Sequence, residues 1–464
     1  MAGTASMRGT ARRAGGVGRR GRRLLTLILP RPYGVGGGLR LASHWDAATD
    51  ALVAARQWAC PTPGLLAIAA LTGDLMDVEL IDEEHETLDL DRGYDLVGMY
   101  AVTHYAPRAY DLAGVLRQRG ATVVLGGVHP SLLPGEAAAH ADAVVVGEAE
   151  ELWPEVVADH LAGRLRPLYR APTGRRPDVR RTPTPRFDLL KPAHYRQFPL
   201  QTARGCPHRC EFCNLPQLYG HGYRAKTVAQ VLAEVAALRR VVPRPTIYFT
   251  DDNFFVDRQR SRELVDALRP LGLTFYANCD ISLADDADLV ERARRAGLRQ
   301  VLVGLESLSG KSLQSLNPSG WKFKRRGGYA DAVRCIQERG VGVVASFVLG
   351  LDGDGLEAFD AVAAFARDTR LYGTSLTVQT PFPGSALCDR LAGEGRILTR
   401  DWNRYTIFEV VMQPRLMSVA ELADGHRRLV AALQSPEAAL ERAAYFKDVW
   451  GRLLAAREGG GGDG

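Results

Sequence analysis

The sequence predicts an α/β protein with a doubly wound parallel sheet followed by a partial (β/α)6 barrel and a small helical C-terminal segment. Three observations predict this fold. Short apolar runs alternate with helix-compatible stretches between residues 24 and 161, as in a doubly wound sheet. From residue 200, six strand candidates alternate with helical stretches, whereas a full barrel needs eight. Between the two units, a Pro- and Arg-rich stretch disfavours regular structure.

The apolar runs of the first unit predict a Rossmann-like domain. We expect its strands at 24–29, 78–82, 94–100, 122–125 and 144–146, and its helices at 63–71, 107–119, 134–140 and 149–161. Parallel sheets of this kind bind ligands beyond the carboxyl ends of their strands. The loops after Tyr100, Leu125 and Val146 are therefore the expected ligand-binding loops.

The second unit repeats a strand and a helix along the chain. We expect strands at 200–203, 246–250, 274–278, 300–305, 343–349 and 375–380, and helices at 227–240, 260–268, 283–296, 329–339 and 356–369. The residues from 390 to 445 have a helical pattern with Leu422, Leu429 and Leu433 on one face, so they should pack over the barrel mouth or its side. The resulting boundaries are a disordered Arg-rich tail at 1–23, a first domain at 24–165, a linker at 166–195, a barrel at 196–388 and a C-terminal segment at 389–464.

The composition argues against a nucleic-acid partner and against a membrane span. The net charge is +6, but seven arginines lie in the first 23 positions, and the rest of the chain carries 52 basic and 53 acidic residues. The tail is either a short disordered arm or a transit peptide, and Met7 is an alternative start to Met1. No apolar run is long enough to cross a bilayer. Seven cysteines, three of them clustered, do not form a disulfide framework and indicate a reducing cytoplasm.

The most informative motif is the CxxxCxxC of Cys206, Cys210 and Cys213. Three thiolates within eight residues hold a metal centre from one side, whereas a structural zinc ion takes four protein ligands. A structural zinc knuckle completed by His208 or a distant cysteine is the alternative. The spacing resembles the radical S-adenosylmethionine (radical SAM) superfamily. That resemblance implies that the cysteines hold a [4Fe-4S] cluster, that SAM chelates its open iron, and that Phe212 lies near the adenine.

The resemblance also implies SAM contacts at the strand ends of the barrel. The string Asp251-Asp252-Asn253 ends the second strand, where the family binds the SAM amino group; a helix N-cap is the alternative. Glu306 ends the fourth strand and could bind a ribose or an ammonium, or form a salt bridge with Arg299 or a neighbouring basic residue. The full set implied for SAM is Phe212, Asp251, Asp252, Asn253, Glu306, Ser346 and Pro381.

The first unit resembles the cobalamin-binding domain that precedes such barrels. The similarity lies in the segments 126–131, which read Gly-Gly-Val-His-Pro-Ser, and 146–150, which read Val-Gly-Glu-Ala-Glu. A generic nucleotide-type sheet with glycine turns is the alternative. The DxHxxG motif that supplies a lower histidine ligand to cobalt is absent, and whether His104, His129 or neither approaches cobalt is left open. The implied cobalamin contacts are Thr103, Gly126, Gly127, His129, Ser131, Gly147 and Glu148.

Together these resemblances imply a cobalamin-dependent radical SAM enzyme. The leading expectation is a methyltransferase that acts on an unactivated carbon or phosphorus of a small-molecule or lipid substrate, through a 5'-deoxyadenosyl radical and methylcobalamin. It would take its electrons from a donor such as flavodoxin or ferredoxin. A non-methylating enzyme with the same cofactors (ring closure, rearrangement or oxygenation) is one alternative, and a zinc- or nucleotide-binding protein without catalysis is another. The sequence identifies neither a catalytic base nor the substrate.

Overall fold

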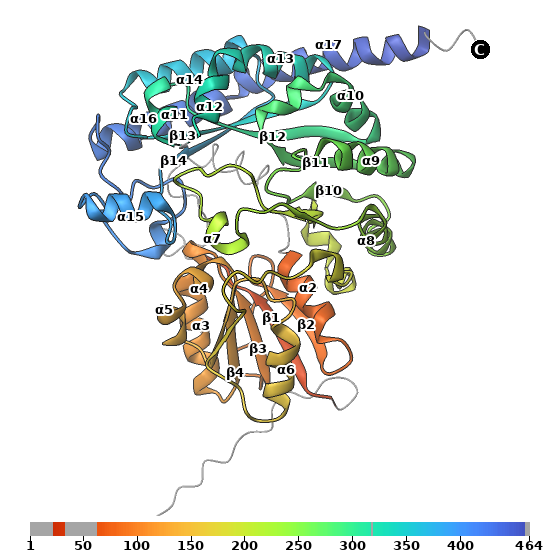
Figure 1. The fold of residues 1–464 in the computed structure, drawn as a ribbon, viewed down its shortest axis with the longest axis vertical. Helices are drawn as coiled ribbons and strands as arrows, with labels where there is room; N and C mark the ends of the chain where they lie inside the picture. The colour runs from red at the N-terminus through yellow and green to blue at the C-terminus, as the bar shows by residue number, and fades with distance from the viewer. Residues whose placement is uncertain (1–21, 33–62, 317–318, 460–464) are drawn as a thin grey trace, which may run out of the picture.

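The computed structural model describes residues 22–32, 63–316 and 319–459, and it confirms the predicted fold class. An N-terminal sheet domain, orange in Figure 1, lies below a larger unit built around the second sheet. The segment that contains α7 (Leu215–Tyr219) lies between them. Almost all of the predicted tail at 1–23, and the end of the chain from 460, lie outside the described residues.

The N-terminal sheet has six parallel strands in the order β2-β1-β3-β4-β5-β6. Their bounds are β1 (Leu24–Leu29), β2 (Asp77–Asp82), β3 (Leu96–Tyr100), β4 (Thr122–Gly126), β5 (Ala143–Val146) and β6 (Leu168–Arg170). Helices on both faces explain why the central strands are continuous apolar runs. They are α2 (Pro63–Thr72), α3 (Ala106–Gln118), α4 (Val128–Leu132), α5 (Pro134–Ala138) and α6 (Trp153–Leu161).

Two separate cores cover the two faces of this sheet. One includes Leu112 and Leu116 of α3, and the other includes Leu65 of α2 and Trp153 of α6. The indole nitrogen of Trp153 donates to Thr72 Oγ1 at 2.9 Å, which satisfies both polar groups inside the apolar layer.

Three local predictions in this domain were wrong. Helix α4 was not predicted, and α6 begins at Trp153 rather than at 149. The stretch expected to be an irregular linker begins with strand β6, which pairs with β5 and buries Tyr169. Its prolines fall outside these three residues, so the pairing of the strand loses no backbone donor to proline.

The second sheet also has six parallel strands among the described residues, in the order β14-β13-β12-β11-β10-β7. This confirms the partial (β/α)6 barrel. The bounds are β7 (Phe198–Leu200), β10 (Thr246–Phe249), β11 (Thr274–Cys279), β12 (Leu298–Glu306), β13 (Gly342–Leu349) and β14 (Gly373–Val378). The predicted helices appear as α8 (Val228–Val241), α9 (Arg258–Leu268), α10 (Ala287–Ala296), α13 (Tyr329–Glu338) and α14 (Glu357–Asp368).

Differences from the expected barrel gather around its first and fourth strands. The first predicted strand divides into β7 and a separate strand β8 (Ala203–Arg204), which pairs antiparallel with β9 (Arg224–Ala225). Two short helices, α11 (Gly310–Leu316) and α12 (Trp321–Arg325), follow β12 and were not predicted.

The C-terminal segment contains α15 (Ala386–Gly393), α16 (Val419–Gln434) and α17 (Pro436–Gly459). Leu422, Leu429 and Leu433 are buried on one face of α16, as predicted, and this helix packs beside α14 and β14. Helix α17 runs across the top of the barrel in Figure 1. No described helix has the length and apolar character that a membrane span requires.

Candidate active site

The three clustered cysteines lie on a loop closed at its base by the β8–β9 ribbon. We call residues 205–223 the cysteine loop. Arg204 and Arg224 face each other in the ribbon, immediately before and after this loop. Gly205 has φ +98°, and a Cβ atom there would lie 2.1 Å from the carbonyl oxygen of Gly222. Only glycine therefore allows the two arms of the loop to approach this closely.

The cysteine side chains are partly buried and lie close enough to influence one another. Burial, with a smaller contribution from the neighbouring Cys210 thiol, raises the pKa of Cys206 to about 11 and that of Cys213 to about 12. Among the described residues, no three His, Cys, Asp or Glu side chains are already gathered in metal-binding geometry. A donor set of thiols on one loop suits an iron–sulfur cluster, whose binding would release their protons.

Glu211 fixes the middle of the cysteine loop to the rest of the barrel. Its backbone NH donates to Leu316 O at 2.9 Å, and its carbonyl oxygen accepts from the NH of Leu387 at 3.0 Å. Its carboxylate accepts two hydrogen bonds from Arg390, which also binds Asp352 after β13. The loop is thus held from α11 and from α15. Sequence reasoning missed this role, because nothing local marks the partner of Glu211.

The two aspartates after β10 hold the beginning of the same loop. Asp251 is fully buried and accepts from the Thr202 NH at 2.6 Å and from Thr202 Oγ1 at 2.5 Å. Burial raises its pKa to about 6, against the effect of the Thr202 hydrogen bonds. Asp252 accepts from the Gly205 NH at 2.8 Å, and burial raises its pKa as well. Both predicted SAM contacts therefore engage backbone that leads directly to Cys206.

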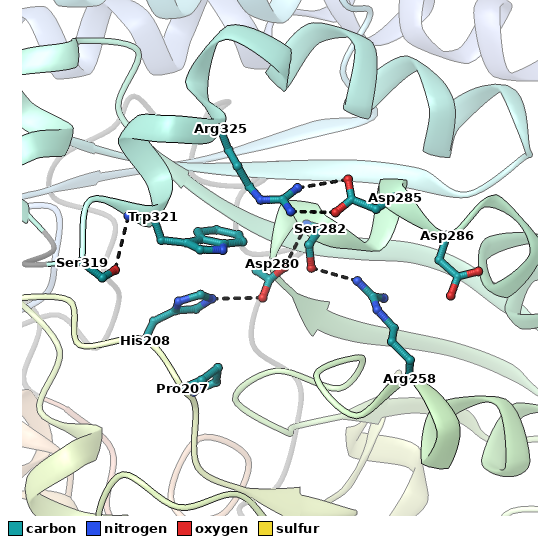
Figure 2. Close-up of a pocket in the computed structure, with 10 residues that line it drawn as sticks. All are labelled: Pro207, His208, Arg258, Asp280, Ser282, Asp285, Asp286, Ser319, Trp321 and Arg325. Atoms are coloured by element: carbon teal, nitrogen blue, oxygen red, sulfur yellow. Dashed lines mark hydrogen bonds and ion pairs between the residues drawn. The ribbon is translucent and has the colours of Figure 1, made fainter.

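A polar cavity of about 590 Å³ lies beside the cysteine loop. His208 Nε2 lies 3.0 Å from Asp280, whose carboxylate also accepts from Asn253 at 2.7 Å. Figure 2 shows the Trp321 ring between His208 and the Arg325 guanidinium. His208, considered above as a fourth zinc ligand, therefore directs this nitrogen toward Asp280. The cavity is lined by Pro207, His208, Arg258, Asp280, Ser282, Asp285, Asp286, Ser319, Trp321 and Arg325.

Glu306 forms a buried ion pair at the end of β12. Lys322 Nζ donates to Glu306 Oε1 at 2.8 Å and to Gly304 O at 2.5 Å. Burial alone would lower the pKa of Lys322, but Glu306 outweighs it and the pKa is raised. Glu306 has φ +66°, a left-handed conformation that is strained for a residue with a side chain. The neighbouring basic residue considered in the sequence is thus Lys322, from the unpredicted helix α12.

The remaining predicted SAM contacts lie on or near β13 and β14. Ser346 lies within β13, in register with Ser375 of β14. Pro381 is buried just after β14, and Phe212 packs against the apolar group of Leu316, Val348 and Leu351. Phe212 thus attaches the cysteine loop to an apolar surface that includes the end of β13.

Two buried polar atoms at this rim have no hydrogen-bond partner among the described residues. They are Thr250 Oγ1, after β10, and Gln379 Oε1, after β14. Buried polar atoms normally have partners, so these atoms fit a rim that binds a polar ligand such as SAM. Sequence reasoning missed both, because neither residue belongs to a recognised motif.

The carboxyl edge of the N-terminal sheet combines one tightly packed glycine with one open glycine. Gly127, which follows Gly126 at the end of β4, has φ +101°, and a Cβ there would lie 2.7 Å from the Tyr100 ring. Ser131 Oγ donates to Gly127 O at 2.6 Å and accepts from the Gly147 NH at 2.8 Å. Gly147 has φ +86° and no atom within 4 Å of a built Cβ. This open backbone fits the approach of a large flat cofactor.

Two other predicted cobalamin residues are buried. Thr103 begins a short 3-10 helix after β3. His129 has an exposed fraction of 0%, and its Nε2 lies 3.1 Å from Glu136, which also accepts from the Trp402 indole NH. Burial lowers the pKa of His129, opposed by Glu136. Its buried Nδ1 has no hydrogen-bond partner among the described residues.

Glu148 was also predicted to contact cobalamin, but its carboxylate binds Arg204 and Arg224 at the base of the cysteine loop. It therefore links the two domains. Of the predicted SAM contacts, Asp251 and Asp252 hold the start of the cysteine loop, and Gly127, Ser131 and Gly147 lie together at the sheet edge.

Family models match both parts of the chain. The Radical SAM superfamily model matches residues 200–366, and the B12 binding domain model matches residues 49–157. The two matches therefore cover parts of both domains, and the Radical SAM match includes the cysteine loop.

Relatives and a solved structure agree with these matches. Bacteriochlorophyllide d C-12(1)-methyltransferase of Chlorobaculum tepidum is 27% identical, over 82% of this chain and 83% of that protein. Hopanoid C-2 methylase of Rhodopseudomonas palustris is 27% identical, over 83% and 73%. The cobalamin-dependent S-adenosylmethionine radical enzyme OxsB, solved with aqua-cobalamin and S-adenosylmethionine bound, has the same fold with a TM-score of 0.65 at 15% identity, over 83% of this chain and 64% of that chain. The chain belongs to the cobalamin-dependent radical SAM enzymes.

Proposed function

We propose that this enzyme transfers a methyl group to an unactivated carbon, or to phosphorus, of a small-molecule or lipid substrate. The observation that carries the proposal is the position of the cysteine loop, which lies between the rim of the barrel and the carboxyl edge of the N-terminal sheet (Figure 1). When bound, the cluster with SAM supplies a carbon radical, and cobalamin supplies the methyl group.

In this proposal the protein positions and encloses its cofactors. Cys206, Cys210 and Cys213 hold the cluster, and Asp252 fixes the start of their loop through Gly205. Lys322, paired with Glu306, lies close enough to Cys210 for the two groups to influence each other electrostatically, beside the proposed cluster site. Gln379 and Thr250 offer unpaired polar atoms to the same ligand.

The relatives narrow the substrate class. The two methylases described above are named for a pigment ring and a polycyclic lipid. We therefore propose an extended, largely apolar acceptor.

Product counting tests methylation directly. The purified enzyme would be reconstituted anaerobically with iron, sulfide, SAM and methylcobalamin, then supplied with tetrapyrrole and hopanoid candidates. Methylation predicts S-adenosylhomocysteine and 5'-deoxyadenosine together, with a product heavier by one methylene group. If 5'-deoxyadenosine alone accompanies product formation, a non-methylating reaction replaces this proposal.

We further propose that an acidic electron carrier, such as flavodoxin or ferredoxin, binds beside α11 and α12. Exposed basic side chains support this, because they flank the segment that contacts the cysteine loop; they are Arg209, Lys311, Lys324 and Arg326. Replacing Lys324 and Arg326 by glutamate should slow cluster reduction by flavodoxin without changing reduction by dithionite. An equal loss with both reductants would contradict this docking site.

A reducing cytoplasm suits the proposed function, since the cysteine thiols must remain available to iron.

A further inference from the structure

One carboxylate of the N-terminal domain grips both ends of the cysteine loop. Glu148 Oε2 accepts from Arg204 Nη1 at 2.6 Å and from Arg224 Nη1 at 3.0 Å. Glu148 Oε1 accepts from Arg224 Nη2 at 2.7 Å. Because Arg204 precedes the loop and Arg224 follows it, this carboxylate bridges the two strands that close the loop.

A second carboxylate completes this group of charged side chains. Glu150 Oε1 lies 2.5 Å from Arg204 Nη2. The exposed fractions of the side chains are 3% for Glu148, 11% for Glu150, 13% for Arg204 and 20% for Arg224. Two acids and two bases balance in charge, and this makes their burial tolerable.

The arginines are also held from the barrel side and from the segment between the domains. Arg204 Nε donates to Gln201 Oε1 at 2.7 Å, and Arg224 Nη1 donates to Pro177 O at 2.9 Å. These two hydrogen bonds orient the guanidinium groups independently of the carboxylates. Bidentate contacts between guanidinium and carboxylate then set direction as well as distance.

Glu148 directly follows the open backbone of Gly147 after β5, but its side chain is held by the two arginines at the base of the cysteine loop. Both of its carboxylate oxygens are already engaged by arginine. A cofactor contact through this side chain would have to displace a buried ion pair.

We propose that Glu148 and Glu150 are positioning residues, which seat the cysteine loop on the N-terminal domain and do not bind cobalamin. The inference rests on the proposed function in one respect: the cysteine loop must be the site of the iron–sulfur cluster. It extends that function by naming the contact that fixes this site relative to the N-terminal domain.

Hydrogen exchange and cobalamin affinity test this inference without turnover. The full chain, reconstituted anaerobically with its cluster, would be compared as wild type, Glu148→Gln, Glu150→Gln and Arg224→Lys. The matched control is Glu155→Gln, which removes an exposed pair with Arg166 on the same domain. Amide exchange is read in residues 205–223 and, as a fold control, in β4 and β5. Hydroxocobalamin affinity is read from visible absorbance.

We expect the amide exchange rate in residues 205–223 to rise at least threefold in Glu148→Gln. The rise should be smaller in Glu150→Gln, and also in Arg224→Lys, because lysine keeps the positive charge at this position. Exchange in β4 and β5 and cobalamin affinity should stay within about twofold of the control. A tenfold or greater loss of cobalamin affinity, whatever the exchange, would make Glu148 a cofactor contact and overturn the inference. An unchanged exchange rate in the cysteine loop would also overturn the inference. So would a rise of similar size in the control strands β4 and β5. If the exchange rates and cobalamin affinities are as expected but the enzyme does not methylate, only the proposed methylation is contradicted.

Discussion

Arg390 binds the carboxylate of Glu211 through two nitrogen atoms, although the two residues are 179 positions apart in the sequence. The Nε–Oε1 distance is 2.5 Å and the Nη2–Oε2 distance is 3.1 Å. Because Glu211 directly follows Cys210, this pair ties the middle of the cysteine loop to α15, the helix after the last barrel strand.

Replacing Arg390 by glutamine should loosen the cysteine loop without unfolding the barrel. Loss of hydrogen bonds to a charged group costs about 2 kcal/mol, and we expect iron loss to a chelator to quicken about tenfold. Timed iron release into bathophenanthroline measures this. Arg452→Gln is the control, because its pair with Asp448 is exposed on α17 and exposed pairs contribute little. Equal release rates in both variants would show that the Glu211 contact does not hold the loop.

Replacing Gly205 by alanine should prevent closure of the same loop. The new methyl group would lie 2.1 Å from Gly222 O, and the φ of +98° disfavours any side chain. We expect iron content below a tenth of wild type, with unchanged far-ultraviolet circular dichroism. Gly222→Ala is the matched control, since no atom lies within 4 Å of a Cβ there. A Gly205→Ala protein that retains full iron would contradict the role of this close approach.

Replacing Lys322 by methionine should destabilise the barrel, because it leaves Glu306 buried without its partner. Breaking a buried pair on one side costs about 3 to 5 kcal/mol. Denaturant unfolding of the wild type, both single variants and the double variant Lys322→Met/Glu306→Gln measures the effect. The double variant should recover part of the loss. If the single losses simply add, the two residues are energetically independent and this prediction is wrong.

Replacing any one of Cys206, Cys210 and Cys213 by alanine should abolish iron retention and SAM cleavage. The reason is that each thiolate would hold a separate iron of one cluster. Iron and sulfide analysis after anaerobic reconstitution measures retention, and Cys335→Ala serves as the control outside the loop. One equivalent of zinc in the wild type, without iron or sulfide, would instead favour a structural zinc site.

The fold could be predicted largely because its strands are buried on both faces. β1 was located to the residue, since six consecutive apolar or β-branched positions end at Pro30. β6 was missed because only three residues pair, inside a stretch rich in proline. α11 and α12 were missed because each is shorter than two turns, so hydrophobic periodicity carries little signal.

The candidate site was predictable where its residues sit in a contiguous motif and unpredictable where they act through distant partners. Local spacing singled out the cysteine triad and the Asp251–Asp252 pair, and the structure places both aspartates on the backbone that leads to Cys206. Nothing in the sequence connects Arg390 with Glu211, or Lys322 with Glu306, because these contacts depend on how the barrel closes. The same reason explains Glu148, whose motif pointed to a cofactor while its side chain meets arginines from the barrel.

The order of the two sheets along the chain has a consequence during synthesis. The N-terminal sheet is complete at β6, before the first barrel strand begins at Phe198. Since domains generally fold as units while the chain emerges from the ribosome, the sheet that carries Glu148 leaves the ribosome before Cys206 does. The cysteine loop therefore emerges beside a folded docking surface, and iron–sulfur assembly factors would meet its thiols with the base of the loop already seated.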